Sequence, residues 1–271
     1  MPVNAGPTPS PGSHRLRFAM LGSGSRGNAL VVSCGSTHVL IDCGFSIRET
    51  ERRLARIGLE AGTLAAIVIT HEHNDHASGA PALARRHRIP LWLTPGTAAA
   101  LGGAVLNDQL VVRHFGGDQR FAIGDLELAP YTVPHDAREP CQFVFSNGDR
   151  RLGLLTDAGH ITAHIERRLR DCDALVLECN HDRDMLADSD YPASLKARIA
   201  GPHGHLDNDA AAALLAGLDA QRLQHVVAAH LSEKNNTPWL ARSTLGSALG
   251  GAPERVEIAS QDGGLPWREL V

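Results

Sequence analysis

Residues 65–76 read AAIVITHEHNDH, an apolar run followed at once by three histidines and an aspartate. A β-branched run of this kind predicts a buried strand, and ligands that directly follow a strand project from a rigid element into a cleft. Side chains two positions apart on an extended segment point the same way, so His71 and His73 can bind one ion. Asp75 and His76 lie where the chain turns toward a helix predicted for residues 78–87. They can reach a second ion, so this stretch predicts two metals.

Three further polar residues stand directly after apolar runs. They are His135 after residues 126–133, Asp157 after residues 152–156 and His230 after residues 225–229. The predicted ligand sets are His71, His73 and His135 for one ion, Asp75, His76 and His230 for the other, and Asp157 between the two.

The ligand types indicate which metal and which chemistry to expect. Imidazoles with carboxylates suit Zn²⁺, with Mn²⁺ or Fe as alternatives because raw affinity alone does not select the ion. Three side-chain ligands per ion leave open positions, as a catalytic site requires. A water held between two such ions loses a proton near neutral pH and becomes a nucleophile. The pattern therefore predicts a hydrolase with two divalent metal ions.

These motifs resemble those of the metallo-β-lactamase superfamily. The matching segments span nearly the whole chain and are Asp42 in LIDCG, the cluster at 71–76, His135, Asp157 and His230. Within the superfamily the chain is similar to the YycJ (WalJ) type, by GSGSRGN at 22–28, PHDA at 134–137, TDAG at 156–159, GHLDN at 204–208 and HLSEKNN at 230–236. The resemblance implies an α/β fold of the αββα sandwich type. It also implies a metal-dependent 5′-to-3′ exonuclease whose partner is the end of double-stranded DNA.

A glutamate and a histidine resemble a pair found in the RNase Z branch of the superfamily. Glu178 follows the run at 173–177, and His205 precedes a helix that Asp207 or Asn208 would cap. The resemblance implies that Glu178 orients His205, whose imidazolium stabilises phosphoryl charge or protonates the departing 3′ oxygen. The predicted catalytic residues are therefore Asp75, Glu178 and His205. Asp207 stands where the YycJ type usually has serine, which adds negative charge near the expected phosphate.

Two other segments are expected to support the site. Asp42 ends the run at 37–41 and, by the same resemblance, accepts a hydrogen bond that holds the histidine loop and fixes an imidazole tautomer. The glycine- and serine-rich stretch at 22–28 can turn backbone N–H groups toward a phosphate, with Ser25 and Asn28 as the predicted phosphate- or substrate-binding residues. The alternative for this stretch is a tight turn.

Length and composition predict one catalytic domain. A chain of 271 residues with 43% hydrophobic content can bury a large core. Residues 1–14 are rich in Pro, Gly and Ser, which predicts a disordered tail before a catalytic domain at 15–271. This tail lacks the features of a signal peptide, and no later run is long enough to cross a bilayer. We therefore expect a cytoplasmic protein with no membrane partner. Its five cysteines, which show no paired spacing, should be reduced and mostly buried.

The predicted order of elements agrees with a sandwich. Strands are expected at 16–21, 29–33, 37–41 and 65–70, and a helix between the last two begins with a capping box of Ser46 and Glu49 and ends at Gly58. Further short strands are expected through Phe145 and Leu155, followed by a helix at 164–170, a strand at 174–177, a helix at 209–218 and a strand at 225–229. The family resemblance, not a sequence repeat, implies two similar halves.

Charge and aromatic content set limits on the nucleic-acid interpretation. The net charge of −4 lacks the basic footprint of non-specific DNA binding. A local patch from Arg26, Arg113, Arg138 or Lys234 would suffice for an enzyme that acts on ends. An aromatic content of 4% disfavours single-strand binding by stacking.

Two alternatives stay open. One is a hydrolase of the same fold that acts on RNA or on a small ester, thioester or lactam. The other is a non-catalytic metal-containing module that binds nucleic acid. The pair Glu178 and His205 favours phosphodiesters, and the complete ligand set with Asp157 disfavours a binding-only module. Nothing in the sequence predicts the oligomeric state.

Overall fold

The computed structural model describes residues 14–103 and 105–271. The tail that we predict at 1–14 therefore lies outside the described residues, apart from His14. None of the described helices combines the length and apolar character that a membrane span requires.

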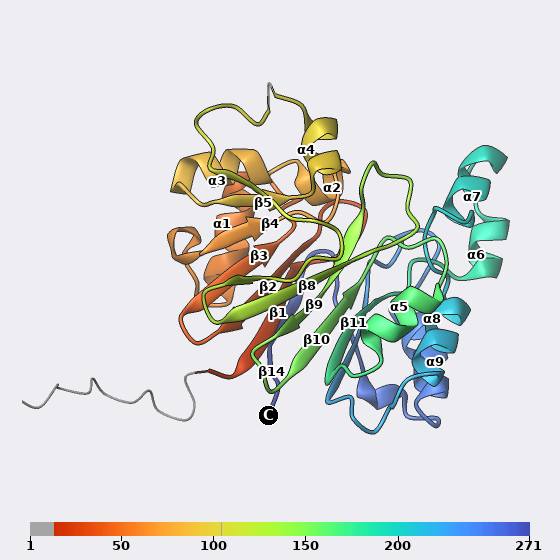
Figure 1. Ribbon diagram of the computed structural model, residues 1–271. Coiled ribbons are helices and arrows are strands. Elements are labelled where there is room, and N and C mark those ends of the chain that lie inside the picture. The colour runs from red at the N-terminus through yellow and green to blue at the C-terminus, as the bar shows by residue number, and fades with distance from the viewer. Residues whose placement is uncertain (1–13, 104) are drawn as a thin grey trace, which may run out of the picture.

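Two mixed sheets, each of seven strands among the described residues, lie face to face (Figure 1). The first runs in the order β14 (Leu265–Glu269), β1 (Leu16–Gly22), β2 (Ala29–Cys34), β3 (Thr37–Ile41), β4 (Ala66–Val68), β5 (Leu91–Leu93) and β6 (Val112–His114). The second runs in the order β13 (Val256–Ile258), β12 (His225–Ala229), β11 (Ala174–Glu178), β10 (Arg151–Leu155), β9 (Cys141–Ser146), β8 (Leu126–Thr132) and β7 (Phe121–Ile123).

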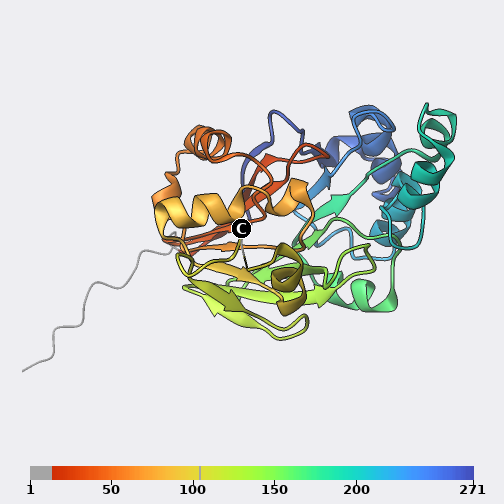
Figure 2. The ribbon, with the colours of Figure 1, turned by 90° about the horizontal axis from the view of Figure 1, so that it is seen from above.

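Helices cover the outer faces of both sheets, as the view from above shows (Figure 2). The helices are α1 (Ile47–Arg56), α2 (Asn74–Ala77), α3 (Ala80–His87), α4 (Pro95–Leu101), α5 (Ala163–Leu169), α6 (Arg183–Asp188), α7 (Ala193–Ile199), α8 (Asn208–Ala216) and α9 (Pro238–Ala248). Apolar residues of α1 and α3 pack on the first sheet, and those of α5, α8 and α9 pack on the second. The predicted αββα sandwich is confirmed.

Strand β2 shows how the sequence produces these layers. All six of its residues are buried, because one face of the strand meets the other sheet and the opposite face meets helices. Leu30 and Val32 belong to the core between the sheets. Ala29 and Val31 belong to the core beneath α1 and α3. The two-residue period of a strand thus sends alternate side chains into different layers.

Parallel pairing brings the functional side chains to one edge. Strands β3 to β6 pair in parallel, and so do β10 to β13. The carboxyl ends of parallel strands meet on the same side of a sheet, which is where open α/β sheets bind ligands. Asp42 follows β3, Asp157 follows β10 and His230 follows β12.

Several predicted boundaries differ from the structure. Strand β4 covers three residues rather than 65–70. The predicted helix at 78–87 begins at Ala80, and the separate short helix α2 carries Asp75 and His76. The capping box is half formed: Ser46 accepts the N–H of Glu49, whose carboxylate binds Arg52 and Arg53 instead. Helices α4, α6, α7 and α9 were not predicted.

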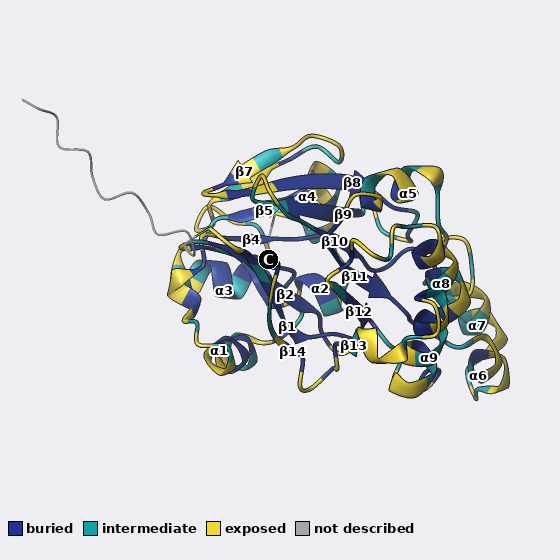
Figure 3. Ribbon diagram, turned by 90° about the horizontal axis from the view of Figure 1, so that it is seen from below, coloured by how far each residue is buried: buried dark blue, intermediate teal, exposed yellow. Residues whose placement is uncertain are grey.

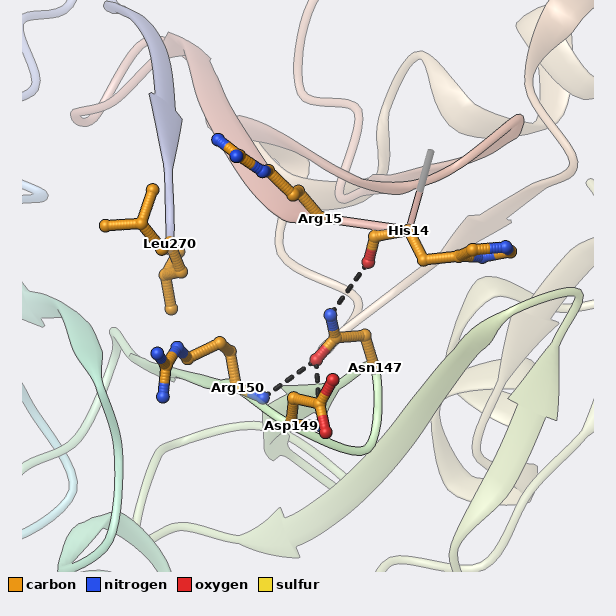
Figure 4. A pocket seen from close by; sticks show the side chains of 7 residues that line it. His14, Arg15, Asn147, Asp149, Arg150 and Leu270 are labelled. Atoms are coloured by element: carbon orange, nitrogen blue, oxygen red, sulfur yellow. Dashed lines mark hydrogen bonds between the residues drawn. The ribbon is translucent and has the colours of Figure 1, made fainter. Parts of the chain in front are cut away.

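An open hollow lies at the other end of strand β10, away from the ligand edge (Figure 4). His14, Arg150 and Leu270 contribute to its lining, and Asn147 donates a hydrogen bond to the backbone oxygen of His14 at 2.8 Å. This bond ties the first described residue to the turn between β9 and β10.

Candidate metal centre

The candidate metal centre lies where the carboxyl ends of strands from both sheets meet. The first sheet supplies Asp42 and the 71–76 segment, and the second supplies Asp157, Glu178 and His230. Within each predicted set the ligand atoms lie within 4.8 Å of one another; the sets are His71 with His73 and His135, and Asp75 with His76 and His230. Asp157 groups with His71 and His76, and also with His230. The structure therefore brings together every residue of the predicted ligand sets.

Distances within the first set show how tightly the nitrogens converge. His135 Nε2 lies 3.2 Å from His73 Nδ1. The ring centroid of His71 lies 4.6 Å from that of His73 and 4.9 Å from that of His135. In the second set, Asp75 Oδ2 lies 3.4 Å from His76 Nε2 and 3.5 Å from His230 Nε2.

Buried atoms without hydrogen-bond partners test whether these residues fit a metal. Among the described residues, His71 Nε2, His230 Nε2 and Asp157 Oδ2 are buried and unpartnered. An unpaired buried polar atom costs about 1–3 kcal/mol. All three belong to the same cluster, and each offers a lone pair. A bound cation satisfies such atoms, so the donor set fits divalent metal ions.

Hydrogen bonds on the outer side of the rings fix which nitrogen faces the centre. His71 Nδ1 contacts Thr70 Oγ1 at 3.0 Å, and His135 Nδ1 contacts the backbone oxygen of Gly204 at 3.0 Å. When Nδ1–H donates outward, Nε2 presents its lone pair inward, which is how metal-binding histidines are normally oriented. His73 uses the other nitrogen: its Nδ1 faces His135.

Asp42 takes the position that the sequence predicts for it. It is buried, and its Oδ2 accepts from His76 Nδ1 at 2.8 Å. Its Oδ1 accepts the backbone N–H of Thr70 at 2.8 Å, and the Thr70 hydroxyl donates to the same carboxylate. Because Thr70 Oγ1 also contacts His71, Asp42 orients His76 directly and His71 through Thr70.

The backbone turns sharply at three site residues. Asp42, Asp157 and His230 have φ values of 59°, 53° and 55°, the left-handed region that side chains other than glycine enter rarely. Each residue lies within two positions of a strand end, where the turn aims Asp157 and His230 toward the cleft and Asp42 toward His76. Such strained conformations gather at functional sites because the surrounding structure holds them in place.

Glu178 has more partners than the sequence predicts. It is 0% exposed, which excludes a surface charge. Its Oε1 accepts from His205 Nδ1 at 2.9 Å and from His230 Nδ1 at 3.0 Å. Its Oε2 accepts the backbone N–H groups of Ala158 and Leu206. The expected contact with His205 is present, and the same carboxylate also orients the candidate ligand His230.

The buried carboxylates make this space favourable for positive charge. Burial opposes a charge on His230, but Asp157, Asp75 and Glu178 raise the pKa of this imidazole to about 10. Burial would raise the pKa of the Glu178 carboxyl, yet the charge and hydrogen bonds of His205 and His230 lower it below its usual range. Divalent ions would supply this positive charge in place of protons.

A cleft of about 340 Å³ opens onto the cluster. Its lining includes Ser25, Asp75, Asp157, His205 and His230, together with Tyr191, Arg198 and Ile199. Asn28 does not line it. The buried Asn28 amide donates toward Asp75 Oδ2 at 3.2 Å and lies 3.1 Å from His76 Nε2. Of the two predicted substrate-binding residues, only Ser25 lines the cleft, whereas Asn28 contacts Asp75 and His76.

Asp207 lies outside this lining. Its side chain accepts the N–H of Ala210 at 2.8 Å and so caps α8. Arg183 pairs with the same carboxylate at 2.9 Å. The negative charge that replaces the usual serine is therefore balanced locally.

Comparisons with known proteins agree with the geometry. Residues 37–227 match the family described as "Beta-lactamase superfamily domain". Exodeoxyribonuclease YycJ of Bacillus anthracis is 35% identical over 260 residues, covering 93% of this chain and 98% of that protein. The chain belongs to the metallo-β-lactamase superfamily. Exodeoxyribonuclease WalJ of Streptococcus pneumoniae, at 31% identity over 266 residues, covers 94% of this chain and 98% of its own length.

Solved structures place the chain on the same fold. The metallo-β-lactamase fold protein YhfI from Bacillus subtilis superposes with a TM-score of 0.74 at 15% identity, covering 95% of this chain and 100% of that one. The short form of human tRNase Z superposes with a TM-score of 0.65 at 18% identity, covering 94% and 99%. Membership of this superfamily implies divalent metal ions, and the histidine and aspartate groups above are able to hold them.

Proposed function

We propose that this metallo-β-lactamase superfamily member is a cytoplasmic 5′-to-3′ exonuclease that removes nucleotides from the ends of double-stranded DNA. The observation that carries this proposal is the pair formed by the buried Glu178 and the partly exposed His205 beside the double ligand set. End-to-end similarity to named exodeoxyribonucleases supports DNA as the substrate.

The residues that would hold the ions are those of the two predicted sets. His71, His73 and His135 would bind one, Asp75, His76 and His230 the other, and Asp157 would contact both. Zn²⁺ is the ion we propose first, because imidazole nitrogens dominate the set. When bound, two such ions supply an activated water and stabilise charge on the phosphoryl oxygens.

Asp75 is the residue we propose to orient the attacking water. Its carboxylate lines the cleft and is partly exposed. The imidazoles of His76 and His230 keep the pKa of this carboxyl below its usual range, even though burial acts in the opposite direction. Asp75 is therefore ionised in the resting site and can accept a hydrogen bond from the attacking water.

His205 is the residue we propose to act on the leaving group. Its Nδ1 is held by Glu178, so the other ring nitrogen is free to face the cleft that His205 lines. A proton on that nitrogen can pass to the departing 3′ oxygen. The Glu178 carboxylate fixes the orientation of the ring through this hydrogen bond.

Duplexes labelled at either the 5′ or the 3′ end, incubated with Zn²⁺ or Mn²⁺, test this function. Release of labelled mononucleotides from the 5′ end first is the expected result. Internal fragments would instead indicate an endonuclease. Cleavage of RNA, esters, thioesters or lactams in place of DNA would favour the second hydrolase class, and binding of DNA without cleavage would favour the non-catalytic module.

The role of His205 has its own test. His205→Ala should lower turnover by about 10²- to 10⁴-fold, the usual contribution of a general acid. Metal content measured by emission spectrometry should stay near that of the wild type. Loss of metal from the variant would make His205 a ligand and refute the assignment.

A further inference from the structure

A helical arm formed by residues 182–204 lies beside the metal cleft. It carries α6 and α7 between β11 and α8, and Figures 1 and 3 show both helices outside the sandwich, with largely exposed surfaces. No residue of α7 is buried, and in α6 only Leu186 is. The arm therefore adds little to the core, so packing does not account for its sequence.

The arm is fixed to the site at its C-terminal end. Arg198 Nε donates to Asp136 Oδ2 at 2.7 Å, and Asp136 directly follows the candidate ligand His135. The Asp136 N–H donates to the backbone oxygen of His203 at 3.0 Å. The His205 N–H donates to the backbone oxygen of Ile199 at 2.9 Å. The arm thus forms the wall of the cleft next to His205.

Tyr191 presents an aromatic ring on this wall. It lines the cleft together with Arg198 and is partly exposed. Lys234 Nζ lies 5.3 Å from the centre of the Tyr191 ring. Within residues 14–103 and 105–271, no carboxylate comes within 4.0 Å of Lys234 Nζ, whereas Arg198 is paired with Asp136. Lys234 is exposed and does not itself line the cleft, but its ammonium lies beside the Tyr191 ring and is available to a phosphate.

We propose that Tyr191 and Lys234 form a subsite for the terminal nucleotide, whose base stacks on the ring and whose 5′ phosphate contacts the ammonium. This inference rests on the proposed function. The oxygen that His205 protonates belongs to the nucleotide that leaves. That nucleotide must lie on the His205 side of the cleft, and the arm is the wall on that side. The ligand class is a nucleoside 5′-monophosphate.

The size of the cleft bears on this ligand class. A volume of about 340 Å³ is at the lower end of the roughly 300–1,000 Å³ of small-molecule pockets. A single nucleotide is a ligand of this class, so the cleft is compatible with binding of the terminal nucleotide. One aromatic ring is enough to stack one base, so the low aromatic content of the chain is compatible with this subsite.

Binding of two small probes tests the subsite without catalysis. We would measure by calorimetry the affinities of metal-loaded protein for dAMP and for deoxyribose 5-phosphate, which lacks the base. Wild type should bind dAMP roughly 5- to 150-fold more tightly than deoxyribose 5-phosphate, which is the range for one base stacked on one ring. We call this factor the affinity ratio. Tyr191→Ala should bring this ratio close to one, and Tyr191→Phe should preserve it. Lys234→Met should lower the affinity for both probes and leave their ratio unchanged.

Trp239 offers a matched control. It is 72% exposed in the first turn of α9 and does not line the cleft, so Trp239→Ala should keep the wild-type ratio. Equal affinities in wild type, a ratio retained in Tyr191→Ala, or a ratio lost in Trp239→Ala would each overturn the subsite. Failure of the exonuclease proposal is a separate result: the ratio would hold while no labelled duplex is cut.

Discussion

Asp42→Asn is the substitution that most directly tests how the ligand histidines are oriented. Asparagine tolerates the left-handed backbone of this position, φ 59°, and has nearly the same shape as aspartate. The backbone N–H of Thr70, 2.8 Å from Oδ1, requires an acceptor, so the amide oxygen takes that place. The amide NH₂ then faces His76 Nδ1, where Oδ2 stood at 2.8 Å.

Two N–H donors cannot face each other, so His76 has to change tautomer. Its proton moves to Nε2, which lies 3.2 Å from Asp157 Oδ2 and is the nitrogen that faces the cluster. His76 Nε2 then no longer has a free lone pair with which to bind the metal. Removal of such an orienting partner typically weakens metal binding 10- to 100-fold, or by about 1.4–2.7 kcal/mol. Since the contact from Thr70 to His71 survives, the loss should fall on the ion that binds His76.

Titration of metal-free protein with Zn²⁺ against a chromophoric chelator would measure both affinities. We expect one weakened ion and one ion bound as in wild type. Asp173→Asn is the matched control. Asp173 is also buried and accepts the N–H of Arg151 at 2.7 Å, but it precedes β11, at the end of that strand away from Glu178 and the metal centre. That variant should lose stability and keep both affinities. Unchanged Zn²⁺ binding in Asp42→Asn would refute the argument that this carboxylate sets the tautomer.

Three further predictions follow from contacts in and around the site. Glu178→Gln should lower both turnover and the affinity for one ion, because Glu178 Oε1 accepts hydrogen bonds from His205 and from His230. A variant that lost turnover alone would show that the contact with His230 does not affect metal binding. Chelation of the metals should lower the melting temperature measured by calorimetry, since each ion present at about 1,000 times its Kd stabilises the folded state by about 4 kcal/mol. Equal melting temperatures with and without chelator would contradict the fit of the donor set to metal. The five cysteines should react slowly with a thiol reagent in the native protein and completely after denaturation. Burial raises the pKa of the Cys43 thiol to about 11 and that of Cys172 to about 12, so a rapidly labelled native thiol would show that one of them is accessible.

The clustering of the proposed ligands was predictable because each of them obeys a local rule. Asp157 and His230 lie at the ends of strands whose apolar runs are plain in the sequence, and both residue types tolerate the left-handed turn that aims them inward. His71 and His73 share one face of an extended segment. Local pattern and tertiary position agree at these residues, so their proximity could be predicted from the sequence.

Other features depend on contacts between distant segments. The bond from Glu178 to His230 joins residues 52 positions apart, and no spacing rule encodes it. The turn of the Asn28 amide toward Asp75 likewise arises only when β2 meets α2. The arm at 182–204 was missed because its helices are short and bury almost no apolar face, so the periodicity that marks a helix is absent.

The division of the centre between the two sheets has a consequence for when the protein becomes active. His71 and His73 come from the first sheet, whereas His230 enters with β12, long after most of the chain has been made. A partly synthesised or truncated polypeptide that stops before His230 lacks a ligand and the strand that carries it. Nuclease activity would therefore emerge only once both halves have closed on each other, so an incomplete chain would lack it.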